Sequence, residues 1–408
     1  MTELVKAFDD MGHRQIVVCG IYPYDRVSLP QGVLTYPVLF TDPAKGHLGF
    51  EHGLIYPDAE FVTEADPPQA VSYPIVGMSD VMPYPSTLYR DMSTDMISEF
   101  EGAFINTIKR AVTDLDPDLI ICHHLFLLTA LVRKHFPDRK IYGISHSTDL
   151  RQMANCENLR AIVHPYIGKL DMILSLHEDQ AVQIKNVFGV DGNRIKIVGC
   201  GYDPKRFNTL GRVSRNSSDP VRLCFAGKLS KAKGIPELLT ALSGIASDES
   251  LPKFTLCLAG GCRDEDVMKM LESLPQYANW AGFVSNEELT DMLKRSDIFI
   301  LPSYYEGLPL VIMESMASGA LPICTDLPGV KKWIDSHVAD SNVRYVPMPE
   351  MCSVDTPTEA GRSKFITDLS SVIKRAIKDV YEGNTGCVPD TDSATWYAVA
   401  SGILKGSY

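Results

Sequence analysis

The chain has 408 residues, of which 45% are hydrophobic and 22% are charged, a composition typical of folded domains rather than of disordered or fibrous chains. The formal net charge of −12 at pH 7 argues against a nucleic-acid partner, because nucleic-acid binding requires clustered Lys and Arg side chains that neutralise phosphates. It also argues against attachment to an anionic membrane through a polybasic helix.

The first half of the chain alternates short apolar runs with helical patterns. Residues 3–11 have the spacing of a short amphipathic helix, and the apolar run QIVVCG follows at 15–20. Because a sheet of this kind normally opens with a strand, we expect a first strand and its loop to be missing. The buried parallel strands expected in this half are 15–20, 118–124, 141–147, 172–177 and 194–199.

The same alternation restarts after a turn-rich segment at 201–220. Strands followed by helices predict an α/β protein with two Rossmann-like, doubly wound domains that face each other across a cleft. Late in the chain, residues 366–380 keep helical spacing, and a final helix is expected near Trp396. The strands expected in this half are 221–228, 254–260, 298–303 and 321–326; the domains expected are 1–205, 206–385 and a C-terminal helical segment, 386–408, that returns to the first domain.

The ten cysteines are scattered singly, without a C-x-x-C pair or a Cys/His ligand spacing. This pattern predicts neither a zinc site nor a disulfide framework, and it favours a reduced, cytoplasmic location. The sequence has no apolar run of transmembrane length and no signal-peptide pattern at its start. We therefore expect a soluble cytoplasmic protein.

Two glutamates follow the strand expected at 298–303. Glu306 falls in the loop after the strand, and Glu314 falls on the helix that begins near Leu310. The start of a helix offers unpaired N–H groups and a positive dipole end to an anion, and carboxylates accept hydrogen bonds from sugar hydroxyls. The pair is suited to bind a phosphate that is joined to polyols. A solvated loop residue at Glu306 and an exposed charge on a helix face at Glu314 would give the same sequence pattern.

Two lysines follow the strand expected at 221–228. Lys228 and Lys233 lie in the segment GKLSKAKG, where two cations can neutralise a diphosphate leaving group. Taken alone, two such lysines are more often surface residues. Their position opposite the glutamate loop favours the functional reading.

GKLSKAKGIPELLTAL and PSYYEGLPLVIMESMASGALPICTDLPGV together resemble the C-terminal domain of retaining glycosyltransferases of family 4, which have the GT-B fold. The usual pattern there is G-R-L-x-x-x-K-G, then two glutamates separated by seven residues. Lys228 stands where the family has arginine, which keeps the charge but loses a bidentate grip on phosphate. Pro322 comes one residue later than usual.

The resemblance implies a donor site in the second domain. Lys228 and Lys233 would hold the diphosphate, Glu306 would contact the donor sugar, and Glu314 would bind the ribose. The base would lie near 280–284, largely against backbone, with Trp280 or Phe283 as candidates for stacking. The donor-binding residues it implies are Gly227, Lys228, Lys233, Gly282, Phe283, Val284, Glu306, Gly307, Leu308, Pro309, Leu310 and Glu314.

In the first domain, the family places a histidine beside the reacting sugar at the position of His146. We therefore group His146 with Glu306, Lys228 and Lys233 as catalytic residues. His123 and His124 end the strand expected at 118–124, and no carboxylate sits at ligand spacing from them, so we expect no metal site. His124 and Asp149 are candidates for acceptor contacts.

The resemblance implies transfer of a hexosyl group from a UDP- or GDP-sugar to an acceptor hydroxyl, with retention at the anomeric carbon. No D-x-D motif ends a strand, and lysines with helix-end amides can stabilise the leaving group, so we expect neither a metal nor another cofactor. Members of the family open with a strand and a glycine-rich loop, and without these full activity would be in doubt.

Three alternative functions remain. A catalytically weak or silent nucleotide-sugar-binding protein and a UDP-sugar epimerase would share the fold. A nicotinamide oxidoreductase would need a G-x-G-x-x-G turn after a strand, and the sequence has none. The expected partners are a nucleotide-sugar donor and a soluble sugar or small-molecule acceptor, with a glycolipid acceptor left open, and no nucleic acid.

Overall fold

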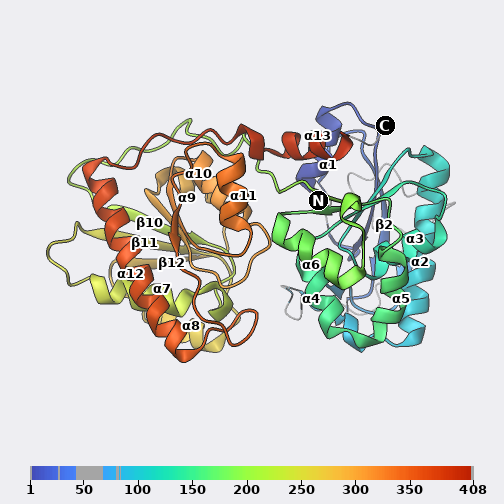
Figure 1. Ribbon diagram of the computed structural model, residues 1–408, viewed down its shortest axis with the longest axis horizontal. Helices are drawn as coiled ribbons and strands as arrows, with labels where there is room; N and C mark the ends of the chain where they lie inside the picture. Colours follow the sequence, from blue (N-terminus) through green and yellow to red (C-terminus); the bar gives the residue numbers. More distant parts are fainter. Residues whose placement is uncertain (1, 26–27, 43–67, 80–81, 83, 406–408) are drawn as a thin grey trace. The chain divides into compact units, whose positions relative to one another are not determined.

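The computed structural model describes residues 2–25, 28–42, 68–79, 82 and 84–405 (Figure 1). The chain divides into two compact units, one formed by Met1–Val198 with Ala400–Tyr408 and the other by Gly199–Val399. The chain passes from one unit to the other after Val198 and again after Val399. The boundaries predicted from the sequence, 205/206 and 385/386, lie seven residues after the first of these points and fourteen before the second.

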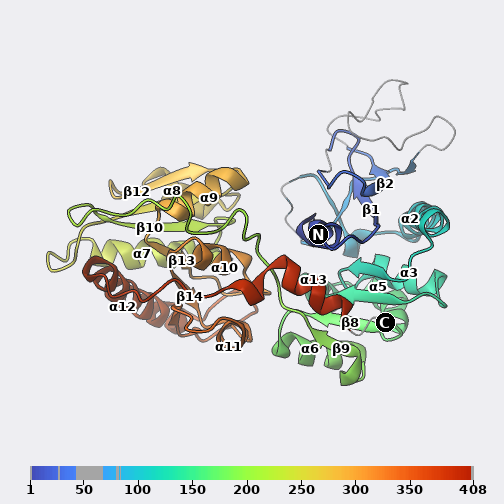
Figure 2. The same ribbon diagram turned by 90° about the horizontal axis from the view of Figure 1, so that it is seen from above.

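The first unit has parallel strands in two main groups, which Figure 2 shows apart from each other. Within the described residues, β1 and β6 each pair on one side only. The expected absence of a first strand and glycine-rich loop stays a prediction. The groups are β1 (Ile16–Ile21), β2 (Leu34–Phe40) and β3 (Gln69–Val71); β6 (Ile120–His123), β7 (Ile141–Ile144), β8 (Met172–Ser175) and β9 (Ile195–Ile197); and the short pair β4 (Val76–Gly77) and β5 (Thr87–Leu88).

Helices cover these strands, and the larger apolar core of this unit lies between them. α3 packs against both α2 and α5, and Phe126, Leu127, Ile141 and Leu159 are each at most 1% exposed. The helices are α1 (Thr2–Asp10), α2 (Thr94–Leu115), α3 (Leu127–His135), α4 (Thr148–Asn155), α5 (Glu157–Ile167) and α6 (Glu178–Phe188), with 3-10 turns η1 (Tyr89–Asp91) and η2 (Gly192–Arg194).

The second unit contains one six-stranded parallel sheet in the order β12-β11-β10-β13-β14-β15. The order reverses between β10 and β13, so the loops after these two strands flank a topological switch point. The strands are β10 (Val221–Ala226), β11 (Phe254–Ala259), β12 (Ala278–Gly282), β13 (Ile298–Leu301), β14 (Leu321–Thr325) and β15 (Arg344–Val346).

Helices cover both faces of this sheet, with α7, α8 and α12 on one face and α9 and α10 on the other (Figure 1). The predicted α/β class with Rossmann-like domains is confirmed. The helices are α7 (Ile235–Ile245), α8 (Glu265–Glu272), α9 (Asn286–Arg295), α10 (Leu310–Ala317), α11 (Val330–His337), α12 (Glu359–Glu382) and α13 (Trp396–Leu404), with 3-10 turns η3 (Lys231–Lys233) and η4 (Asp392–Ala394).

Local sequence signals set the helix ends. Ser285 and Glu288 form a reciprocal capping box at the start of α9. The Thr358 side chain accepts a hydrogen bond from Gly361 N, and Gly383 ends the same helix at φ 76°. α12 therefore extends beyond the apolar stretch at 366–380 that predicted it.

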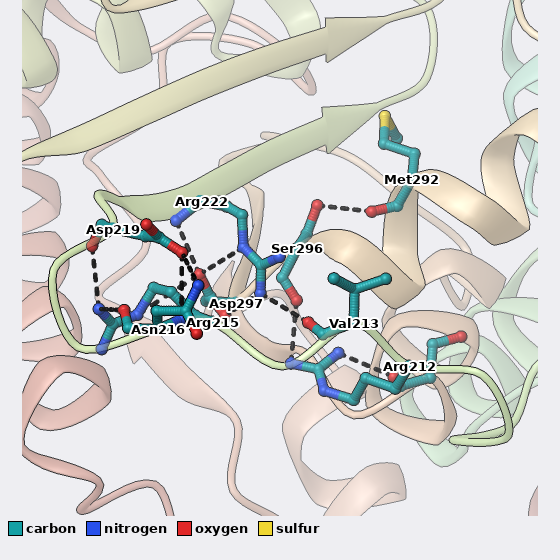
Figure 3. Close-up of polar contacts among 10 residues, drawn as sticks. Arg212, Val213, Arg215, Asn216, Asp219, Arg222, Met292, Ser296 and Asp297 are labelled. Carbon is teal, nitrogen blue, oxygen red and sulfur yellow. Dashed lines mark hydrogen bonds and ion pairs between the residues drawn. The ribbon is translucent and has the colours of Figure 1, made fainter.

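The turn-rich segment before β10 is bound to the amino-terminal edge of the second sheet (Figure 3). Arg212 donates to Ser318 O at 2.9 Å and to Ser296 O at 3.0 Å. Arg222 holds the Asp297 carboxylate with two guanidinium contacts of 3.0 and 2.8 Å, and its backbone N–H donates to the same carboxylate at 2.8 Å.

Replacing Asp297 by alanine is expected to lower the free energy of unfolding by about 2 kcal/mol, because the half-buried Arg222 loses the acceptor of its backbone N–H and the carboxylate that binds its guanidinium. Asp297→Asn, which keeps an acceptor oxygen, is expected to lose less. Urea unfolding followed by fluorescence measures both changes. Equal stability of Asp297→Ala and the unchanged protein would show that the carboxylate contributes nothing.

The segment that returns to the first unit does so later than the sequence predicted. Tyr202 forms a parallel bridge with Thr395, and a side chain on Gly201 would lie 2.4 Å from Trp396 N, so most of 386–399 packs within the second unit. Only residues from Ala400 onward belong to the first unit. There Lys196 Nζ donates to Gly402 O at 2.6 Å.

Candidate functional site

The predicted site residues of the second unit follow the two strands at its switch point. Lys228 comes after β10, and Glu306 comes after β13, which pairs with β10 in parallel. Parallel strands present their carboxyl ends at one edge of the sheet, and ligands of open α/β sheets bind in the crevice there. The sheet order therefore brings these two loops together.

Direct contacts connect the two loops. Tyr304 N donates to Ala232 O at 3.0 Å. Gly234 has φ 67°, and a Cβ there would lie 2.2 Å from Pro302 O, so only glycine allows this approach. As a result, Lys233 Nζ lies 2.6 Å from Glu306 Oε1, with side-chain exposures of 24% and 17%.

Lys228 differs from Lys233 in its surroundings. It is exposed, and its ammonium makes no ion pair within the described part of the chain. The structure thus offers one cation held by a carboxylate and one that is open to a ligand. Together they can bind an anion of more than one charge.

α10 begins beside Glu306. Its N-cap is Pro309, which provides no side-chain cap to the first turn, so backbone N–H groups there are available to an anion. Leu308 is buried, Gly307 and Leu310 are half-buried, and Glu314 lies half-buried one turn into the helix. The pKa of the Cys200 thiol is raised, mainly by burial and to a smaller extent by the Glu314 carboxylate.

Three glycines at neighbouring strand ends support the lysine loop. Gly260 N donates to Gly282 O at 2.7 Å, and Gly227 N donates to Ala259 O at 3.0 Å. A Cβ on Gly260, which has φ 132°, would lie 1.8 Å from Gly227 O. Sequence reasoning missed Gly260, although a Gly-Gly pair directly after a buried strand was the available signal.

The segment expected to contact a base contains two aromatic residues in different settings. Trp280 Nε1 donates to Gly260 O at 2.9 Å, which fixes the orientation of its half-buried indole. Phe283 is 87% exposed, and it follows Gly282, which has φ 73°. Val284 is half-buried. Phe283 is the more exposed of the two stacking candidates, and stacking on a base stays a prediction.

In the first unit, three histidines gather at the carboxyl ends of β6 and β7. His123 Nδ1 lies 3.0 Å from His146 Nε2, and the His124 ring lies 4.6 Å from the His146 ring, centroid to centroid. Burial lowers the pKa of His123 to about 3 and that of His146 to about 2. All the rings are half-buried.

Asp149 has a different role from the predicted acceptor contact. Its side chain is 0% exposed, and it accepts hydrogen bonds from Leu125 N at 2.8 Å, Ser145 Oγ at 3.0 Å and His146 N at 3.3 Å. A carboxylate that is buried and bonded in this way fixes the two loops that carry the histidines. It has no face left for an acceptor.

Metal binding was not expected from the sequence. No group of three or more His, Cys, Asp or Glu side chains in the described ranges has the geometry to hold a metal ion. The three histidines contact one another without a carboxylate that completes a ligand set. Among the described helices, none combines the length and the hydropathy that crossing a bilayer requires.

The parallel sheets, the switch point and its loops define a GT-B-type α/β protein, and solved structures share this fold. Sucrose-phosphate synthase from Thermosynechococcus elongatus matches with a TM-score of 0.57 and 16% identity over 96% of this chain and 98% of that one. Anabaena HepE in complex with UDP and glucose matches with a TM-score of 0.52 and 14% identity, over 97% of this chain and 99% of that one. The lipopolysaccharide outer core galactosyltransferase WaaB matches with a TM-score of 0.54 and 14% identity, over 96% of this chain and 99% of that one.

Residues 208–344 match the family described as Glycosyl transferases group 1. The matched residues lie within the second unit and include both loops of the switch point. A Bacillus subtilis protein named as a teichuronic acid biosynthesis glycosyltransferase, TuaC, is 43% identical over 56 residues, which span 14% of this chain and 14% of that protein.

Proposed function

We propose that the protein is a retaining glycosyltransferase of family 4 that transfers a hexosyl group from a UDP- or GDP-sugar to an acceptor hydroxyl. The observation that carries this proposal is the Lys233–Glu306 pair, with its 2.6 Å contact, at the switch point of the second sheet. It lies within the region that matches the Glycosyl transferases group 1 family. The fold neighbour HepE is described in complex with UDP and glucose.

In this proposal each part of the site has one task. Lys228, Lys233 and the first-turn amides of α10 hold the diphosphate. Glu306 accepts hydrogen bonds from the donor sugar, and Glu314 accepts them from the ribose. His146 contacts the reacting sugar from the first unit.

The bond between the anomeric carbon and the diphosphate oxygen breaks, and the electron pair leaves with the diphosphate. The lysines and helix amides stabilise the developing negative charge. The acceptor oxygen bonds to the anomeric carbon from the same face, and its proton passes to a phosphate oxygen. NMR of the product with a donor of known configuration tests this step, and inversion would refute it.

We expect the transfer to need no divalent metal ion, because two ammonium groups and helix amides supply the positive charge that the leaving group needs. With excess EDTA, the initial rate is expected to stay within about twofold of the untreated rate, since neither ammonium group nor helix amides depend on a metal. The measurement is release of the nucleoside diphosphate. A large loss of rate that Mg²⁺ or Mn²⁺ restores would contradict the metal-independent mechanism.

The same assays separate the alternatives. Nucleotide binding without turnover of any donor would indicate a silent binding protein. A new free sugar formed without an acceptor would indicate an epimerase. A thermal-shift screen of UDP-, GDP- and ADP-sugars selects the donor, because a ligand at about 100 times its Kd adds about 2.7 kcal/mol of stability.

We infer a cytoplasmic location and a soluble sugar or small-molecule acceptor. All ten cysteines are free thiols, which fits a reducing compartment, and the chain carries a formal net charge of −12. Comparing free sugars with glycolipids in vesicles as acceptors tests the second point.

A further inference from the structure

His123 has no role in the proposed mechanism, but it contacts His146, which does have one. Its Nδ1 lies 3.0 Å from His146 Nε2, and the two ring planes differ by 21°. The strand register explains the contact, because His123 pairs with Ile144 across β6 and β7. The side chain two residues after Ile144 therefore lies beside His123.

The backbone on both sides of this contact is held in place. His124 has φ 68° and Ser147 has φ 66°, and such left-handed conformations persist in non-glycine residues only where surrounding contacts impose them. The buried Asp149 carboxylate binds the loops after both strands. Gln180 Nε2 donates to Ser147 Oγ at 2.7 Å. The two rings thus meet in one arrangement.

The hydrogen bond constrains where the protons lie. Both rings are neutral, because burial disfavours the charged form, so one nitrogen of the contact donates and the other accepts. Neutral histidine intrinsically prefers its proton on Nε2. Both rings keep that preferred form only if His146 Nε2 donates to His123 Nδ1.

One nitrogen of His146 then remains for a ligand. With the proton on Nε2 and shared with His123, Nδ1 carries an unprotonated lone pair and can only accept a hydrogen bond. In a sugar-transfer site, the hydroxyl groups of the substrate are the donors that such an acceptor recognises.

We propose that His123 is a positioning residue for His146: its Nδ1 keeps the His146 proton on Nε2, so that His146 Nδ1 accepts a hydrogen bond from a hydroxyl of the sugar substrate. The choice of a sugar as the ligand rests on the proposed function. The tautomer itself depends only on the contact between the two rings.

Nitrogen-15 NMR of the ligand-free protein tests the tautomer directly. The expected result is His146 protonated on Nε2 in the unchanged protein and in His123→Asn, whose amide oxygen can take the place of Nδ1. In His123→Leu, the His146 signals are expected to shift towards the average of two exchanging tautomers. His135→Gln, on α3, is the control and leaves them unchanged.

Kinetics give the second readout. His123→Leu is expected to lower kcat/KM about 10- to 100-fold through misplacement of His146, mainly in kcat, while His123→Asn recovers most of the rate. The proposal is overturned if His146 carries its proton on Nδ1 in the unchanged protein, or if His123→Leu changes neither the signals nor the rate. Failure of every donor to turn over would refute the proposed function instead, and the tautomer measurement would still decide the role of His123.

Discussion

Alanine in place of Lys233 is expected to lower kcat/KM for the nucleotide sugar about 10²- to 10³-fold, the usual cost of removing a preorganised group that stabilises a leaving anion. The ammonium of Lys233 is held at the switch point by Glu306 at 2.6 Å and is only 24% exposed. Its charge is therefore fixed before the donor arrives. Steady-state assays of donor consumption measure the effect.

Lys231 provides a matched control. It lies in the same 3-10 turn, is 59% exposed at its side chain, and pairs with Asp266 at 2.5 Å. Lys231→Ala removes the same charge from the chain, so a rate within about twofold of the unchanged protein is expected if only the preorganised lysine acts on the leaving group. Equal losses in both variants would mean that the general charge of the loop matters, and not the position of Lys233.

Replacing Glu306 by glutamine is expected to act in the opposite direction on the nucleoside diphosphate product, which should bind more tightly. The carboxylate beside Lys233 neutralises the ammonium and repels a diphosphate. Removing that charge is expected to tighten binding of free UDP or GDP about tenfold, an estimate that allows for partial solvent screening of the pair. Turnover is expected to fall because the contact to the donor sugar weakens. Calorimetric titration with the free nucleoside diphosphates measures the binding.

The Lys233–Glu306 pair shows what the sequence predicts well. The two residues are 73 positions apart, but each follows an apolar strand, and the ends of parallel strands share one edge of a sheet. The sequence does not reveal which strands are neighbours. The placement of β10 beside β13 results from long-range packing, and only the resemblance to family 4 suggested it beforehand.

The first unit shows the limits of the sequence more clearly. Asp149 looked like a residue that meets an acceptor, because the pattern reveals a carboxylate near a strand end but not its burial. His123 was recognised at a strand end, but its partner depends on the register of β6 against β7. A one-residue shift of that register would turn the side chain to the other face of the sheet.

The boundary between the units illustrates the same limit. The turn-rich segment at 201–220 predicted the crossing point near 205, yet the division lies at Val198 and Gly199. Arg212 donates to Ser296 O and Ser318 O, and Arg222 of β10 donates to Val213 O, so these contacts hold the segment to the edge of the second sheet. Turn composition marks a connection, but it does not show to which unit the connection is bound.

Gly260→Ala is expected to destabilise the second unit by more than about 3 kcal/mol, because the new methyl group has no space and the backbone has no allowed alternative. The Cβ would lie 1.8 Å from Gly227 O, a backbone atom, at φ 132°. The main chain at Gly227 would have to move, and Lys228 would move with it. A fall of roughly 10 °C in the melting temperature follows for a unit of this size.

Gly261→Ala is the matched control, since the adjacent glycine has nothing within 4 Å of its Cβ position and should accept alanine with little change. Differential scanning calorimetry compares the two variants, and nucleotide binding at a temperature where both are folded separates stability from site geometry. If Gly260→Ala melts like Gly261→Ala, the contact between the ends of β10 and β11 is not rigid. The loop that carries Lys228 and Lys233 would then owe its position to Tyr304 and Gly234 instead, because these residues provide the contacts with the loop after β13.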